Sequence, residues 1–235
     1  MKVKSPLFSD SLFDKNLGSY ADKDGFTSIK GQIKKLGSLI DGLSSIRENR
    51  DPFKTQAQIE IDYKASYEKA QVAAKDSLNR TINTIVAMQD SAHEKMLSTT
   101  KLNQLSPHAA EIRQVLRSFG DSEEGEAKRE AFLSKAVSNG KADIINAIMN
   151  TPAELSFLSD TKVNKFVGLF IDTYAPEYNA EMAAISKAEE MLKLAHDAYV
   201  KDSEAMRDPT LEVKSETEKQ RADEAEKAFN QAMAS

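Results

Sequence analysis

Three histidines are the residues of this 235-residue chain best suited to acid–base or metal chemistry near neutral pH, since the chain has no cysteine. Asp90 and His93 are three positions apart, so on a helix they would share one face. A helical di-metal centre needs a carboxylate and a histidine at this spacing on a second helix as well. Near His196, however, Lys193 occupies the carboxylate's position. The sequence therefore predicts no metal site.

Two other spacings resemble catalytic motifs without completing them. His93 and the glutamate after it begin like a zinc-protease helix, but Leu97 stands where the second histidine is required. Gly120 and Gly125 have the spacing of a phosphate-binding loop, but Glu126 stands where that loop needs its lysine. The segment around His93 is expected to be an ordinary helix, and the segment from Gly120 to Gly125 is expected to be an ordinary loop.

Carboxylates also occur in pairs, Glu123-Glu124 and Glu189-Glu190. Adjacent residues on a helix do not face each other, so these pairs are expected to be solvated. The chain has no nucleophile elbow, dinucleotide-binding glycine fingerprint or calcium-binding loop. We therefore predict a protein that is not an enzyme and that uses no cofactor.

The composition favours an all-α protein with no β-sheet. Glycine and proline are sparse, at 9 and 6 residues, tryptophan is absent, and 29% of the residues are charged. The net charge of −5 argues against nucleic acid as a main partner, because binding phosphates needs a positive surface. No apolar run approaches the ~20 residues that span a bilayer, and the N-terminal residues lack the apolar core of a signal peptide.

The distribution of glycine, proline and apolar residues divides the chain into four predicted regions. Residues 1–24 form an N-terminal arm, which is expected to be extended with one short helical turn and to lie on a surface of its own chain or of a neighbour. Residues 25–105 form a hairpin or rod of long helices. Residues 106–175 form a compact head of short helices, and residues 176–235 form a long helix followed by a charged C-terminal helix. Together these regions predict an elongated bundle or rod with a head.

A helix predicted over residues 27–48 carries an apolar stripe with heptad spacing. The stripe consists of Ile29, Ile33, Leu36, Ile40 and Leu43. It lasts about two and a half heptads, fewer than the three to four that indicate a coiled coil. It is therefore either core within one chain or a seam between chains. Gly31, Gly37 and Gly42 weaken the helix but permit close approach of another helix.

Residues 53–103 contain no glycine or proline and are predicted to form one helix of roughly 75 Å. Asp51 is the expected N-cap and Pro52 the first helical residue. Weak helix formers leave a break near residues 76–79 as an alternative. A narrow apolar stripe follows in the second half, which is expected to need a partner. Its candidate interface residues are Leu78, Ile82, Ile85, Met96 and Leu102.

Start and stop signals divide the rest of the chain into further helices. One begins at the Ser106-Pro107 pair, and others are predicted over 122–138, 142–149 and 177–207. Asp160 is expected to cap a further helix before the Ala175-Pro176 pair, and Asp208-Pro209 is expected to end the helix over 177–207. Capping boxes are expected at 151–154 and at 215–218, the second of which starts the last helix. The last helix places Ala222, Ala225, Phe229 and Met233 on one side.

Residues 139–152, with Leu155-Ser-Phe-Leu-Ser159 after them, resemble an element of small helical proteins found among bacteriophage structural genes. In those proteins a similar short helix, proline and Leu-Ser pair precede a long charged helix. The resemblance covers about residues 130–205 and brings no functional residue with it. It implies a self-associating component of a phage-like virion or of its assembly machinery, located in the virion or the host cytoplasm. The alternative is a cytosolic helical adaptor, chaperone or inhibitor that binds one protein partner.

Overall fold

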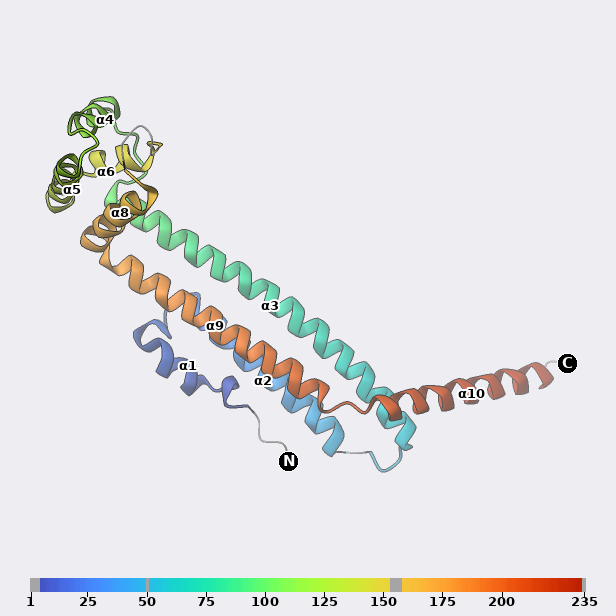
Figure 1. The fold of residues 1–235 in the computed structure, drawn as a ribbon. Coiled ribbons are helices and arrows are strands. Elements are labelled where there is room, and N and C mark those ends of the chain that lie inside the picture. The colour runs from blue at the N-terminus through green and yellow to red at the C-terminus, as the bar shows by residue number, and fades with distance from the viewer. Residues whose placement is uncertain (1–4, 50, 153–157, 234–235) are drawn as a thin grey trace. The chain divides into compact units, whose positions relative to one another are not determined.

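The computed structural model describes residues 5–49, 51–152 and 158–233. Within these ranges every regular element is a helix and no strand occurs, which confirms the predicted all-α fold (Figure 1). The chain divides into two compact units. Unit 1 consists of Met1–Ile85 and Ser186–Ser235, and unit 2 consists of Val86–Ile185.

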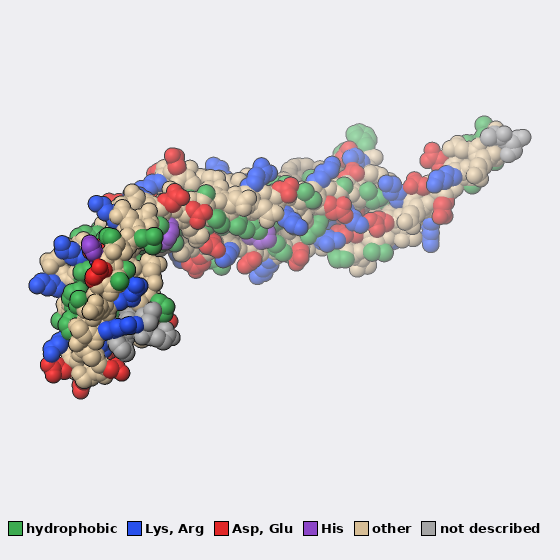
Figure 2. Space-filling model, turned by 90° about the horizontal axis from the view of Figure 1, so that it is seen from above, with side chains coloured by type: hydrophobic (Ala, Val, Ile, Leu, Met, Phe, Trp, Pro, Cys, Tyr) green, Lys and Arg blue, Asp and Glu red, His purple; other side chains and the backbone are tan. Residues whose placement is uncertain are grey.

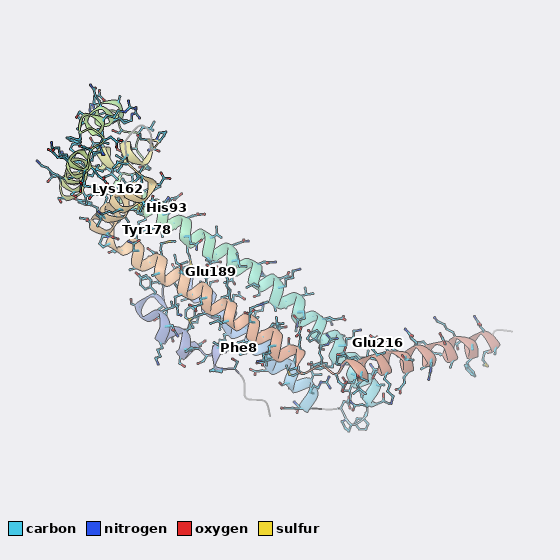
Figure 3. All side chains as sticks on the ribbon, viewed as in Figure 1. Phe8, His93, Lys162, Tyr178, Glu189 and Glu216 are labelled. Atoms are coloured by element: carbon cyan, nitrogen blue, oxygen red, sulfur yellow. The ribbon has the colours of Figure 1, made fainter. Side chains whose placement is uncertain are left out.

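The N-terminal segment of unit 1 is helical, which corrects the predicted extended arm. A short 3-10 helix, η1 (Pro6–Phe8), leads into α1 (Asp10–Leu17) and a second 3-10 turn, η2 (Gly18–Tyr20). Phe8, Phe13 and Leu17 are buried, and both η1 and α1 contact α2 (Figure 3 labels Phe8). Because Phe13 and Leu17 are four residues apart, they lie on the same side of one short helix. Gly18 ends that helix with a φ of 54°, a conformation that glycine adopts without strain.

Helix α2 (Phe26–Glu48) begins and ends within one residue of its prediction. In unit 1 it lies beside α3 (Gln56–Thr100), since Gln32 accepts a hydrogen bond from Ser77. Nearer the other end of α2, Arg47 pairs with Glu60 of α3 at 2.8 Å. The α2 helix is therefore fixed to α3 by polar contacts at two places.

Helix α3 begins later than predicted, because Thr55 and not Asp51 precedes it. The Thr55 hydroxyl accepts a hydrogen bond from the Gln58 N–H at 3.2 Å, and the Thr55 carbonyl accepts one from Ile59. The Asp51 carboxylate instead accepts from the Phe53 N–H at 2.9 Å and closes a turn. No break interrupts residues 76–79, where α3 continues as a single helix.

Two helices complete unit 1: the C-terminal part of α9 (Pro176–Glu204) and α10 (Pro209–Met233). The predicted capping box at 215–218 is wrong, since Ser215 is a buried residue inside α10. Asp208 serves instead, because its carboxylate accepts a hydrogen bond from the Leu211 N–H at 3.1 Å. Pro209 then stands at the first helical position, where its missing N–H costs nothing.

Unit 2 contains the predicted short helices. They are α4 (Ala109–Ser118), α5 (Glu123–Ser138), α6 (Ala142–Met149) and α8 (Asp160–Tyr174). Ser122 caps α5 by accepting a hydrogen bond from the Gly125 N–H at 3.1 Å. Asp160 is the first residue of α8 and not its cap, because Ser159 holds that position. Half of the capping box predicted at 151–154 lies outside the described residues.

Candidate protein-interaction surfaces

The predicted stripe of α2 is core of unit 1. Each of its five residues is at most 6% exposed. Leu43, for example, packs with Tyr63 and Ala70 of α3. A seam between chains would need these side chains at the surface. Their burial therefore supports the first of the two alternatives, an intramolecular core.

The predicted stripe of α3 is also largely covered. Ile85, Met96 and Leu102 are buried, and Leu78 is half-buried. Met96 and Leu102 belong to the hydrophobic core of unit 2, together with residues of α4, α5, α6 and α8. Only Ile82 of the ten candidate residues is exposed, at 44%. The expected interface is corrected accordingly: the chain itself covers stripes that look unpartnered when each helix is considered alone.

Other apolar side chains of unit 1 are exposed instead. Phe53, in the turn before α3, is 96% exposed, and Val72 on α3 is 61% exposed. Three more lie on α10, and these are Val213, Phe229 and Met233. Single exposed apolar residues are common on protein surfaces, so only their arrangement can indicate a binding site. On α10 they form such an arrangement, and partly buried apolar side chains of α2 and α3 line a groove.

The first turns of α10 are attached to unit 1 by buried polar contacts. Arg207 donates two hydrogen bonds to the Glu212 carboxylate, at 2.6 and 3.0 Å, and stacks over the Tyr67 ring at 4.7 Å. Glu212 is only 5% exposed, and its hydrogen bond with Arg207 holds its pKa below the ordinary value. Lys64 of α3 pairs with Glu216 one turn further along (Figure 3). The start of α10 is therefore a fixed junction.

A second polar cluster lies nearby in unit 1 and supports this junction. Glu60, fully buried, accepts hydrogen bonds from Arg47 at 2.8 Å and from Gln56 at 3.0 Å. The Arg47 guanidinium stacks over the Tyr63 ring at 4.1 Å. Tyr199 is also fully buried, and burial raises its pKa to about 12. Tyr199 stays protonated near pH 7, and the pair of Arg47 with Glu60 joins α2 to α3, so we interpret this cluster as structural.

Beyond its junction, α10 is exposed along its whole length. Every residue from 216 to 233 is exposed, and we call this part the outer segment. One of its sides carries Ala222, Ala225, Phe229 and Met233 at helical spacing. Acidic and basic side chains lie along the same helix (Figure 2). The outer segment is thus an amphipathic helix whose apolar side is uncovered.

An apolar groove runs between α2 and α3 on the surface of unit 1. It has a volume of about 400 Å³ and contains no residue of α9 among those that line it. Its apolar lining consists of Leu39, Gly42, Leu43, Ile46, Ala70 and Ala73. A Cβ atom at Gly42 would meet nothing within 4 Å, so the groove is open at this point. The sequence marked Gly42 as a place of close helix approach, but no stripe pointed to its neighbours.

Unit 2 contains Asp90 and His93, which were considered for metal chemistry, whereas His196 lies in unit 1. Asp90 and His93 are both exposed, and the His93 ring lies 6.3 Å from that of Tyr178 (Figure 3). Over the described part of the chain, no group of three histidine, aspartate or glutamate residues is placed to hold a metal ion. The same residues include no helix with the length and apolar character of a membrane span.

A smaller hollow of about 250 Å³ lies beside His93, with Lys95, Met96, Tyr174 and Tyr178 among its lining residues. Its rim carries an exposed ion pair between Lys95 and Glu177 at 3.2 Å. Its lining among the described residues contains Thr99, Tyr174, Tyr178 and the exposed Lys95–Glu177 pair, but no histidine. The chain matches no protein-family model, and searches among curated proteins and solved structures find no match either.

Proposed function

We propose that this protein is a non-enzymatic assembly protein that self-associates through the outer segment of α10. The observation that carries the proposal is the uncovered apolar side of that segment. Phe229 and Met233 are 64% and 74% exposed, although the segment belongs to a helix that is firmly attached at its base. The large apolar residues of an amphipathic helix normally pack against another element of the structure.

Within the described chain, the outer segment lacks the contacts along its apolar side that normally stabilise a helix. Most helical stability in proteins comes from packing an apolar side, and the apolar side of this segment is exposed. Burying a phenylalanine or methionine side chain contributes about 1.5–3 kcal/mol. A partner that covers this side would therefore stabilise the helix and gain affinity from the same residues.

Self-association in a phage-like virion, or during its assembly in the host cytoplasm, is the form of this function that the resemblance of residues 130–205 favours. The alternative is an adaptor that uses the same helix to bind one different protein. Both need the outer segment, but only the first gives a change of mass in the purified protein. The two proposals are therefore separated by measuring mass without any partner present.

The experiment is sedimentation equilibrium or light scattering over a wide range of concentrations. We expect a mass that rises to a multiple of the 26.0 kDa chain. The double variant Phe229→Glu/Met233→Glu should remain a monomer. The matched control is Phe53→Glu, which changes an apolar side chain that is 96% exposed but lies outside α10. A wild-type chain that stays monomeric at every concentration would contradict self-association and favour the adaptor.

A further inference from the structure

We infer that the outer segment of α10 from one copy docks in the groove between α2 and α3 of a second copy. This inference rests on the proposed self-association and names the surface that receives the helix. The groove and the helix are both in unit 1, both are apolar, and each lacks a covering element. The groove and the helix also fit each other in length, shape and charge.

The groove is long enough for a helix. It continues into a second hollow that includes Val72, shares Lys69 and Ala73 with the groove, and extends as far as Arg80 on α3. The combined surface spans residues 65–80 of α3, or roughly 22 Å at 1.5 Å per residue. The outer segment, residues 216–233, is about 27 Å long by the same rise. The helix therefore covers the groove along its whole length.

The shapes of the two surfaces also suit close packing. Small residues, Gly42 and Ala73, stand along the groove, and Ala222 and Ala225 stand on the helix. Small residues on both sides let two helices approach closely, and a larger side chain then fills the space that remains. Phe229 is that side chain on α10, and the open space at Gly42 lies in the groove.

The charges at the Val72 end of the groove favour the same occupant, whereas a hollow at the Ile46 end carries Asp51 and Asp62 against Lys54. At the Val72 end, the rim of the groove and the adjoining hollow carry Lys35, Lys69 and Arg80 against Glu68 and Asp76. The outer segment contains more acidic than basic residues. Opposite net charges guide association and select the orientation of docking, even where each exposed pair contributes little affinity.

The occupant is a second copy because the junction directs α10 away from its own groove. Arg207 and Glu212 fix the first turns, and the pair of Lys64 with Glu216 continues that attachment along α3. From there α10 extends beyond the ends of α2 and α9 that lie next to it in unit 1 (Figure 1). To reach its own groove, α10 would have to break the Lys64–Glu216 pair and reverse its direction.

The absence of cysteine from the chain permits a direct test. Single variants Gly42→Cys and Ala73→Cys place a thiol in the groove, and Ala222→Cys, Ala225→Cys and Phe229→Cys place one on α10. A groove variant is mixed with a helix variant and oxidised mildly. We expect at least one pairing to give a disulfide-linked product of twice the chain mass, because a disulfide needs Cα atoms about 4.4–6.8 Å apart. Leu194→Cys, exposed on α9, is the matched control and should not cross-link with the α10 variants.

A second variant tests the same contact without a cross-link. Gly42→Leu fills the open space in the groove and should weaken self-association at least tenfold, with an unchanged helical circular dichroism spectrum. If the wild type self-associates but no groove pairing cross-links and Gly42→Leu associates normally, the docking site is wrong and the proposed function stands. If the wild type is a monomer, the proposed function itself fails. If the double variant Gly42→Cys/Ala225→Cys closes a disulfide within one monomer, α10 occupies its own groove and the inference is overturned.

Discussion

Helices α2 and α10 belong to the same unit and have almost the same length, 23 and 25 residues, but their apolar stripes differ in burial. The stripe of α2 is buried throughout, whereas that of α10 is exposed beyond Ser215. Both stripes have helical spacing, so periodicity does not separate them. The difference lies in side-chain size: isoleucine and leucine dominate the first stripe, and alanine supplies half of the second.

Size matters because each buried methylene group contributes about 0.8 kcal/mol. The α2 stripe gains enough from burial to order the other helices of unit 1 around it. The α10 stripe gains less, and a fixed polar junction, not an apolar contact, attaches the helix to the unit. Apolar stripes of equal period therefore become core or docking surface according to the side-chain volume that they can bury.

The largest effect is expected from shortening a side chain in the α2 stripe. Ile33 is 2% exposed, so Ile33→Ala removes buried methyl groups and leaves a cavity. We expect a loss of about 2–5 kcal/mol in the free energy of unfolding. Denaturation in guanidinium chloride measures it. A loss below about 1 kcal/mol would mean that α2 is not core, and the contrast with α10 would disappear.

The next effect concerns Tyr199, which is fully buried and whose hydroxyl has no hydrogen-bond partner within the described residues. Its pKa is raised by burial to about 12 from 10.0. The protonated form is therefore favoured by the fold: its contribution is complete below pH 10 and is lost as the pH rises through 12. Two pKa units correspond to about 2.7 kcal/mol.

Comparing Tyr199→Phe with the wild type between pH 9 and 12 measures this contribution. The variant should lose less stability over that range than the wild type, while Tyr20→Phe, at a half-buried position, should behave like the wild type. Near pH 7 the Tyr199→Phe variant should be neutral or slightly more stable, since it removes a buried hydroxyl without a partner. Equal alkaline losses in all three proteins would show that Tyr199 is accessible to solvent.

A smaller effect is expected at the junction. Glu212→Gln removes the charge that pairs with Arg207, and we expect a loss of about 1–3 kcal/mol, because the remaining hydrogen bonds stay partly formed. The pKa of Glu212 is lowered from 4.5, so its contribution is present above that pH and is lost as the pH falls below it. Urea denaturation at pH 7 and pH 3 should show a larger difference between wild type and variant at pH 7 than at pH 3. Limited proteolysis near residues 205–215 should also become faster in the variant.

The smallest effect on folding is expected from Phe229→Ala. The side chain is 64% exposed, so the free energy of unfolding of the monomer should change by less than about 0.5 kcal/mol. Urea denaturation at low protein concentration, where the chain is monomeric, gives this value. A loss above 1 kcal/mol would show that Phe229 is packed within its own chain. The stripes of α2 and α10 would then differ only in how much of each is buried.

The sequence predicted α2 to within one residue because its large apolar residues keep one spacing from start to end. Helix starts were harder to predict where two residues can each serve as the N-cap. Asp51 and Thr55 can both precede α3, and the chain uses the second. The pair Asp208-Pro209 was interpreted as the end of α9, but the same two residues also start α10.

The candidate surfaces were predictable only in part. The apolar side of α10, with Phe229 and Met233, follows from spacing alone. The groove does not, because it is made of residues from two helices that lie 20 or more positions apart in the chain, such as Gly42 and Ala73. Whether a stripe is covered depends on which elements pack over it, and for Ile85, Met96 and Leu102 those elements are distant in sequence.

One consequence of the junction concerns the number of chains in an assembly. Each copy offers one helix and one groove, so its valence is two, and the contact joins unlike surfaces. Two copies that exchange helices reciprocally close as a dimer, three or more close as a ring, and a rotation that does not close gives an open polymer. The direction in which α10 leaves its unit selects among these, and Arg207, Glu212, Lys64 and Glu216 fix that direction. Substitutions there should therefore change stoichiometry, whereas substitutions in the groove change affinity.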